Sequence, residues 1–149
     1  MDEALSYEQA AALNQAIRLV GIRHKALAAS LLGRLGLHPG QEVLLLQLDE
    51  HGPRTQAQLA AGAGCEPPSV TLMVRKLEAA GLVAREPSPD DRRSVTVSLT
   101  PRGRALVPEL HATWRELADT TVAGLGTTPA PALIAALTDL AAGLGARGR

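Results

Sequence analysis

The chain has 149 residues, 46% of them hydrophobic, which is enough for one domain whose core is built mainly from Leu, Ala and Val. The formal net charge is zero, which excludes a uniformly basic protein, so any nucleic-acid-binding surface must come from local clustering of charge. The single cysteine excludes a disulfide within the chain, and no apolar run reaches the roughly 18 residues that a membrane span needs.

A long helix is predicted over residues 6–34. Its apolar residues fall on or near one stripe: Leu13, Ile17, Val20, Leu27 and Leu31. A helix with such a stripe must bury it against another element. The residues before this helix lack the basic start and apolar centre of a signal peptide, so we expect a cytoplasmic protein without a membrane segment.

Two shorter helices are predicted next. The first, from Gln41 to about Glu50, is apolar nearly all round its middle and should lie beneath other elements. A very short strand is expected at Pro53-Arg54. The second helix begins at Thr55, which has the capping-box spacing to Gln58. Glycines in the segment 62–64 then allow a sharp turn, as in a helix-turn-helix.

The segment 67–81 predicts the helix around which the chain is organised. Pro67 and Pro68 suit a first helical turn, and Gly81 suits the position just past a helix end. One face of the helix is apolar, and comprises Val70, Met73, Val74 and Leu77. The opposite face comprises Ser69, Thr71, Leu72, Arg75 and Lys76. Short polar groups and cations of this kind suit a helix laid in a DNA major groove.

A β-hairpin is predicted after this helix. Val95, Val97 and Leu99 alternate with polar residues, which is typical of a half-buried strand. The preceding segment 87–91 has the Pro and Asp residues of a turn. Between Arg75 and Arg104 there are seven basic and four acidic residues. This local excess of positive charge favours a DNA-binding surface, although an ordinary solvated surface can also carry it.

Two further helices are predicted at the C-terminal side. Thr100 can cap a helix that has Pro101 at its first position and runs to about Ala123. Pro108 should bend this helix or delay its start. A last helix begins near Thr128-Pro129, and the residues from Gly143 onwards should fray into a tail.

The expected architecture is one mainly α domain with a small β-hairpin wing. A winged helix-turn-helix over residues 38–100 is flanked by the helix of residues 6–34 and by the helices of residues 101–146. The flanking helices have apolar faces outside the compact winged helix, and pairing with a second chain is the simplest way to bury them. Such a two-fold dimer would place two recognition helices about 34–36 Å apart, so the DNA operator would be an inverted repeat.

Three sequence blocks occur in order within this region: LEAAGLV at 77–83, DDRR at 90–93 and LTPRG at 99–103. In combination they resemble the multiple-antibiotic-resistance regulator (MarR) family of bacterial transcription factors. The resemblance implies a homodimer formed by the terminal helices, bound to double-stranded DNA. It also implies a repressor that a small-molecule effector releases, with the effector in the cleft between the dimer helices and the winged-helix lobe.

The predicted DNA contacts are Thr55, Gln56, Pro68, Ser69, Thr71, Leu72, Arg75, Lys76, Asp90, Arg92 and Arg93. Each has an alternative structural role. Ser69 can cap the helix instead, Thr71 can simply be solvent-exposed, and the two cations of the helix can belong to a solvated face. Many family members have a basic residue in place of Leu72, which can instead touch a thymine methyl group.

The resemblance also assigns a role to the hairpin. One arginine there enters the minor groove, which we expect to be Arg92, and Asp90 holds it through an ion pair. Narrow minor grooves attract arginine because their negative potential is enhanced. The alternative role of Asp90 and Asp91 is plain turn formation.

The remaining candidates concern ligands. Possible effector-lining residues are Arg18, His24, His38, His111 and Trp114, although each can be an ordinary surface or packing residue. Cys65 lies just before the central helix and can be either a redox-sensing thiol or a small structural residue. The histidines lack metal-site spacing and no phosphate loop or nucleophile–base arrangement is visible, so we expect no metal, cofactor or enzymatic activity. A winged helix that docks another protein is the remaining alternative.

Overall fold

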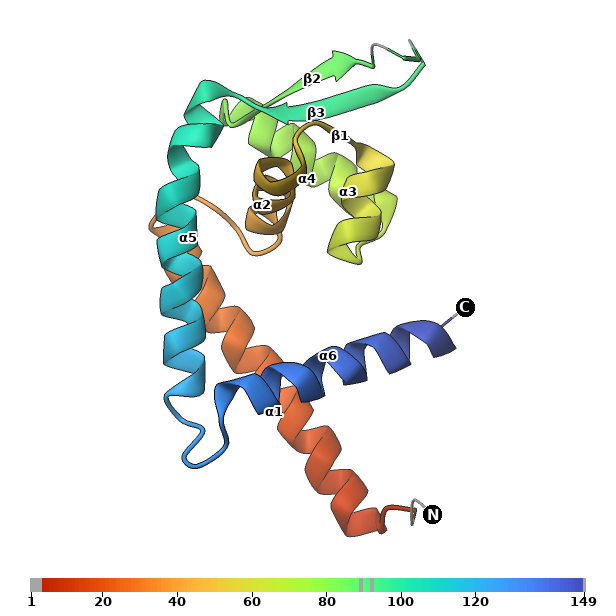
Figure 1. The fold of residues 1–149 in the computed structure, drawn as a ribbon, viewed down its shortest axis with the longest axis vertical. Helices are drawn as coiled ribbons and strands as arrows, with labels where there is room; N and C mark the ends of the chain where they lie inside the picture. Colours follow the sequence, from red (N-terminus) through yellow and green to blue (C-terminus); the bar gives the residue numbers. More distant parts are fainter. Residues whose placement is uncertain (1–3, 89, 92, 149) are drawn as a thin grey trace. The chain divides into compact units, whose positions relative to one another are not determined.

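The structure is a computed structural model that describes residues 4–88, 90–91 and 93–148. The chain divides into two compact units, Met1–Trp114 and Arg115–Arg149. The helices are α1 (Tyr7–Gly33), α2 (Gln41–His51), α3 (Gln56–Ala63), α4 (Pro67–Ala79), α5 (Pro101–Val122) and α6 (Ala130–Arg147), and the strands are β1 (Arg54–Thr55), β2 (Val83–Pro87) and β3 (Val95–Leu99) (Figure 1). This mainly helical fold with a small antiparallel sheet confirms the predicted fold class.

The capping signals in the sequence set the starts of two helices. At α3 the Thr55 hydroxyl accepts a hydrogen bond from the Gln58 backbone N–H at 3.2 Å, and the Thr55 N–H donates to the Gln58 side-chain oxygen at 2.9 Å. This reciprocal pair is the predicted capping box. Ser6 and Gln9 form the same arrangement at the start of α1.

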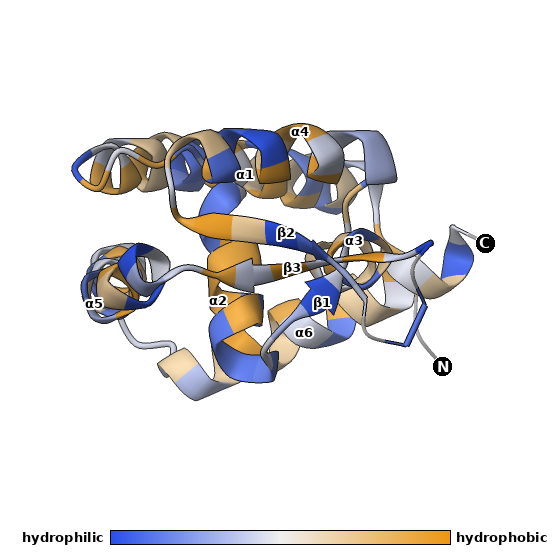
Figure 2. Cartoon of the chain, turned by 90° about the horizontal axis from the view of Figure 1, so that it is seen from above, coloured by the Kyte–Doolittle hydropathy of each residue, from blue (hydrophilic) through white to orange (hydrophobic). Residues whose placement is uncertain are grey.

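The sheet has the strand order β1-β3-β2, and both pairings are antiparallel. The register pairs Val83 with Leu99 at the base of the hairpin and Pro87 with Val95 near its tip. β1 adds Arg54 opposite Val97, one residue later than the predicted short strand. Figure 2 shows β2 changing from hydrophobic at its start to hydrophilic towards the tip, so the base of the hairpin belongs to the core.

The core of the winged helix lies where α2, α3, α4 and the base of the sheet meet. Its fully buried side chains include Leu44, Leu45, Leu59, Val70, Val74, Leu77 and Val97. The predicted support helix α2 therefore lies beneath the other elements, and α4 turns its apolar face inwards. Val95 is 42% exposed, because β3 has left the core by that point, so its predicted apolar face is buried only at Val97 and Leu99.

The structure corrects two expectations for the C-terminal helices. α5 begins at Pro101 and is helical through Pro108, so of the two expected effects of Pro108, a bend or a delayed start, the delayed start is wrong. One proline removes one hydrogen bond of the ladder, while the flanking Val107 and Leu110 are buried and hold the helix in place. α6 continues to Arg147 instead of fraying at Gly143, because the helix-favouring alanines and leucines around each glycine outweigh its cost of about 1 kcal/mol.

The start of α5 is tied to the turn that follows α4. The Thr100 hydroxyl donates to the Gly81 carbonyl at 2.6 Å and accepts from the Gly103 N–H at 3.0 Å. The Thr100 N–H donates to the Leu82 carbonyl at 3.1 Å. A Cβ atom on Gly103 would collide with the Leu82 carbonyl oxygen. The end of the LEAAGLV block and the LTPRG block are therefore packed and hydrogen-bonded together, and they form a junction between the turn after α4 and the start of α5.

Because of this junction, we expect the stability of the protein to respond unequally to a Gly→Ala substitution inside the junction and to one outside it. Gly103→Ala should lower the free energy of unfolding by about 3 kcal/mol, because backbone atoms of Leu82 must move. Gly33→Ala is the control, since a Cβ there meets nothing within 4 Å; it should stay within about 1 kcal/mol of wild type. Urea denaturation measures both changes, and equal stabilities for the two variants would contradict the role given to this junction.

Candidate nucleic-acid interface

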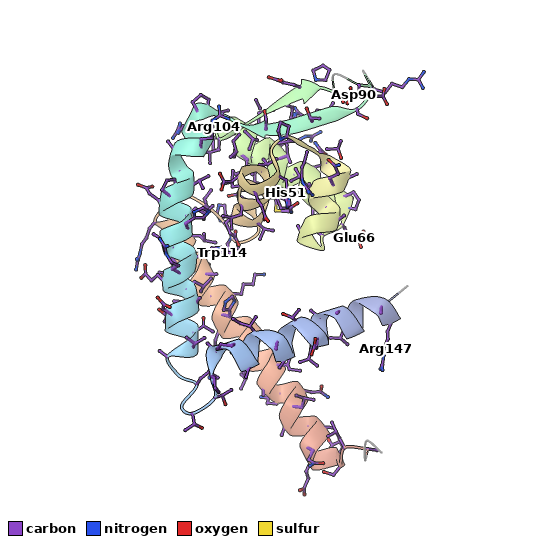
Figure 3. The ribbon with its side chains drawn as sticks, in the orientation of Figure 1. His51, Glu66, Asp90, Arg104, Trp114 and Arg147 are labelled. Atoms are coloured by element: carbon purple, nitrogen blue, oxygen red, sulfur yellow. The ribbon has the colours of Figure 1, made fainter. Side chains whose placement is uncertain are left out.

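The turn between α3 and α4 sets the direction of α4. Gly64 ends α3 in the left-handed conformation with φ +64°, and the Cys65 N–H returns to the Ala60 carbonyl at 3.1 Å. Glu66 is the N-cap of α4, with Pro67 at the first helical position, where a missing N–H costs nothing. Figure 3 labels Glu66 at this start of α4 and Asp90 near the hairpin tip.

One face of α4 is buried and the other is open to solvent. Val70 and Val74 are 0% exposed and Leu77 is 1% exposed. The exposed residues of the helix are Pro67, Pro68, Ser69, Leu72, Arg75, Lys76 and Ala79. Ser69 does not cap the helix, since Glu66 is the N-cap, so that alternative is wrong. Within the described part of the chain, Arg75 and Lys76 form no ion pair.

Thr71 is half-buried and braces α4 against α3. Its hydroxyl lies 3.0 Å from the Gln56 side-chain oxygen and 3.1 Å from the Pro67 carbonyl oxygen, and both of these atoms are acceptors. The hydroxyl proton is therefore used inside the protein, and the alternative of simple solvent exposure is wrong. The brace fixes Gln56 and Thr71, two predicted DNA contacts, relative to each other.

An ion pair joins the end of α4 to the first strand of the wing. The Arg85 guanidinium donates to both carboxylate oxygens of Glu78, at 3.1 and 3.0 Å. This hydrogen bonding lowers the pKa of Glu78 and raises the pKa of Arg85. The pair joins one charge of each sign at the surface, so the excess of positive charge from Arg75 to Arg104 is unchanged.

The described part of the wing tip is a hydrogen-bonded turn. The Asp91 carboxylate accepts from the Arg93 N–H at 2.9 Å, and the Asp91 carbonyl accepts from the Ser94 N–H at 3.0 Å. Asp91 thus has the turn-forming role. Asp90 and Arg93 are exposed. Arg92, the residue expected in the minor groove, lies outside the described residues, and so does its ion pair with Asp90.

Among the described residues, none of the five predicted to line an effector site lines the cavity formed by the segments around Leu35, Ala80 and Leu106. Arg18, His24, His38 and His111 are exposed, and Trp114 is 43% exposed. His111 instead lies 3.7 Å from the Asp49 carboxylate on α2.

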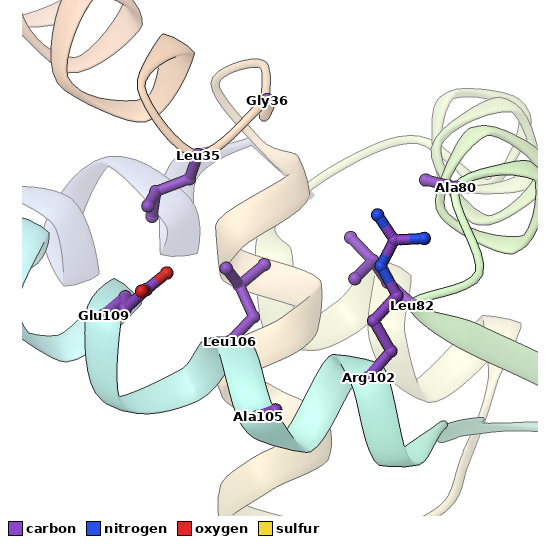
Figure 4. Close-up of a pocket in the computed structure, with 8 residues that line it drawn as sticks. All are labelled: Leu35, Gly36, Ala80, Leu82, Arg102, Ala105, Leu106 and Glu109. Atoms are coloured by element: carbon purple, nitrogen blue, oxygen red, sulfur yellow. The ribbon is translucent and has the colours of Figure 1, made fainter.

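A cavity of about 400 Å³ lies between the loop after α1, the turn after α4 and the first turns of α5. Its lining residues are Leu35, Gly36, Ala80, Leu82, Arg102, Ala105, Leu106 and Glu109. Figure 4 shows the Arg102 guanidinium on the Ala80 side of Leu106 and the Glu109 carboxylate on the Leu35 side. Sequence reasoning missed this site because three distant segments form it; Arg102 of the LTPRG block was the available signal.

Cys65 is half-buried, and its Sγ lies 3.6 Å from the Ala63 carbonyl oxygen. It directly precedes Glu66, the N-cap of α4. As the single cysteine of the sequence it has no partner for a disulfide within the chain, and a redox-sensing role is not favoured. Among the described residues no cluster of three or more His, Cys, Asp or Glu side chains could hold a metal ion. No described helix is both long and apolar enough to cross a membrane.

A helix-turn-helix with an exposed second helix, followed by a β-hairpin, defines the winged helix-turn-helix class of DNA-binding proteins. A family model described as the MarR family matches residues 37–95. The transcriptional repressor Rv2887 of Mycobacterium tuberculosis is 39% identical over 98 residues, which are 66% of this chain and 70% of that protein. The chain belongs to the MarR family, as its three sequence blocks predicted.

Other similar proteins differ in how much of their length is matched. The repressor NicR of Pseudomonas putida is 34% identical over 85 residues, which are 57% of this chain and 54% of NicR, so the match spans about half of that protein. The repressor CouR, solved bound to a 23-mer DNA duplex, is 29% identical with a TM-score of 0.81, covering 94% of this chain and 99% of that one.

A further solved structure is that of BpsR from Bordetella bronchiseptica. It is 25% identical with a TM-score of 0.81, covering 93% of this chain and 98% of that one. The structure concerns the regulation of BpsR DNA binding by 6-hydroxynicotinic acid.

The exposed cations of α4 give a prediction about salt dependence. Lys76→Ala should weaken binding to operator DNA. It should also reduce the steepness of the slope of log affinity against log salt concentration by about two, since a dimer loses two phosphate contacts. Fluorescence anisotropy at several salt concentrations measures this slope. Lys25→Ala on α1 is a control with the same change of charge on an exposed residue, and its slope should equal that of wild type. An unchanged slope for Lys76→Ala would remove this residue from the interface.

Proposed function

We propose that this protein is a homodimeric, sequence-specific DNA-binding transcriptional repressor that a small-molecule effector releases from its operator. The observation that carries the proposal is α4: its apolar face is buried beneath the sheet, and its outer face presents Ser69, Leu72, Arg75 and Lys76. A DNA-binding regulator would need no catalytic group, and we propose that it acts in the cytoplasm, where the chromosome lies. Thr55, Gln56, Pro68 and the wing residues Asp90, Arg92 and Arg93 remain proposed contacts.

The terminal helices support the dimer. On α1, Leu13, Ile17 and Val20 are 46%, 54% and 60% exposed. On α6, the exposed apolar residues are Ile134, Leu137, Leu140 and Leu144. Each helix by itself leaves more apolar surface in water than a stable isolated chain favours, and a second copy offers the complementary surface. Two copies of α4 related by a two-fold axis would recognise an inverted repeat.

The cavity supports control by a ligand. Its walls come from the turn after the recognition helix, at Ala80 and Leu82, and from the start of α5, at Arg102 and Leu106. An occupant that fits only one spacing of these segments would select that spacing. A changed position of α4 in each subunit alters the separation of the two recognition helices, so the dimer no longer fits both grooves. The aliphatic walls and the Arg102 cation suit a small organic acid whose carboxylate lies at the Arg102 end, away from the Glu109 carboxylate.

The test of the proposed function is a mobility-shift assay with the DNA that flanks the protein's own gene. We expect retardation of that fragment at nanomolar protein and no comparable retardation of random DNA of equal length. Equal affinity for both fragments would contradict sequence-specific regulation and favour a winged helix that docks another partner.

The dimer gives a second prediction. Leu137→Asp should dissociate the dimer and lower operator affinity by at least tenfold, because a carboxylate would have to be buried in the interface. Asp139→Ala is the control, since Asp139 lies on the opposite side of α6 from the apolar residues. Analytical ultracentrifugation reports the assembly state of both variants. A wild-type monomer at micromolar concentration would contradict the proposal directly.

The ligand gives a third prediction. Small carboxylic acids, beginning with 6-hydroxynicotinic acid, should lower operator affinity of the wild type and raise its thermal stability. Arg102→Ala should abolish both responses while still binding the operator, whereas Arg115→Ala, on the same helix and outside the cavity lining, should keep them. Equal responses in the two variants would show that the cavity is not the effector site.

A further inference from the structure

The outer face of α4 has little capacity to hydrogen-bond base edges. Ser69 and Thr71 are the only hydroxyl residues of the helix, and no other polar side chain precedes Arg75. The Thr71 proton is engaged with Gln56 or Pro67, at 3.0 and 3.1 Å. Ser69 is therefore the one exposed hydroxyl that the first two turns can offer to a base.

The same face has an apolar surface at its centre. Leu72 is 54% exposed, and Pro68, four residues earlier, is exposed beside it on the same side of the helix. Arg75 and Lys76 follow at three and four residues beyond Leu72, so cations border the apolar surface on its C-terminal side. With these cations on phosphates, Leu72 would face the base edges in the major groove.

The groups that the base edges present in the major groove limit what an aliphatic side chain can contact favourably. The edges of the base pairs in the major groove carry acceptors, amino donors and one apolar group, the C5-methyl of thymine. If Leu72 packed against an amino or carbonyl group of a base, that group would lose its hydrogen bond to water and gain none from the protein. Leu72 against a thymine methyl buries apolar surface on both partners and leaves no polar group unpaired.

We propose that Leu72, flanked by Pro68, contacts a thymine methyl group in each half-site and so favours a T·A pair at that position. The proposal rests on the proposed function and adds to it the base that this chain prefers. It assigns sequence preference to an apolar contact, with Ser69 supplying a polar one. Burying one methyl group stabilises a complex by an amount equivalent to about fourfold in affinity.

The experiment measures whether the effect on affinity of removing a thymine methyl group depends on the Leu72 side chain. A duplex bound by the wild type is selected from random sequence, and each thymine of the two half-sites is replaced by uracil in symmetric pairs, which removes only the methyl groups. At one symmetric pair, the wild type should lose on the order of tenfold in affinity, from two methyl groups. Leu72→Ala should bind more weakly and be insensitive to uracil at that pair. Ser69→Ala, the matched control, should keep the full sensitivity.

The outcomes separate the two claims. Sensitivity at one pair that disappears only in Leu72→Ala supports the thymine contact. If the wild type binds DNA but its affinity is insensitive to uracil at every thymine, the contact is overturned and the proposed function stands. The same holds if the sensitivity to uracil persists in Leu72→Ala. Failure to select any duplex overturns the proposed function, and the thymine contact with it.

Discussion

The burial of Val70, Val74 and Leu77 against α2, α3 and the sheet is the constraint on which the rest of the structure depends. These three side chains fix the rotation of α4 about its axis, and a helix with one buried face must turn the opposite face to solvent. Ser69, Leu72 and the two cations are therefore exposed as a consequence of core packing. A DNA-binding surface made in this way is rigid, because moving it would open the core.

The recognition helix is also connected to the rest of the chain at both ends. At its start, Thr71 and Gln56 join it to α3; at its end, Glu78 pairs with Arg85 of the wing. Thr100 then joins the turn after α4 to the first residues of α5. The cavity lies beside this last connection, where an occupant would select one spacing of α4 and α5. Control would thus act on the segment from Ala80 to Gly103, which directly follows the recognition helix.

Much of this arrangement could be predicted from the sequence, because local rules determine it. Pro67, Gly81 and the Thr55–Gln58 box fix helix ends through backbone chemistry that a few residues contain. The cavity could not be predicted, since its walls come from residues near 35, 80 and 105 and depend on how the segments pack. The brace at Thr71 was missed because its partner, Gln56, lies 15 residues earlier. The delayed start expected at Pro108 was wrong because its buried neighbours, Val107 and Leu110, outweigh a local penalty.

The most direct test of the central claim is the symmetry of the complex on DNA. Hydroxyl-radical footprinting of the operator, together with the mass of the complex by light scattering, reports where the chains lie and how many are present. The account predicts two chains per duplex and two equivalent protected regions in major grooves one helical turn apart, roughly 34–36 Å. One chain per duplex, or a single unpaired protected region, would contradict it.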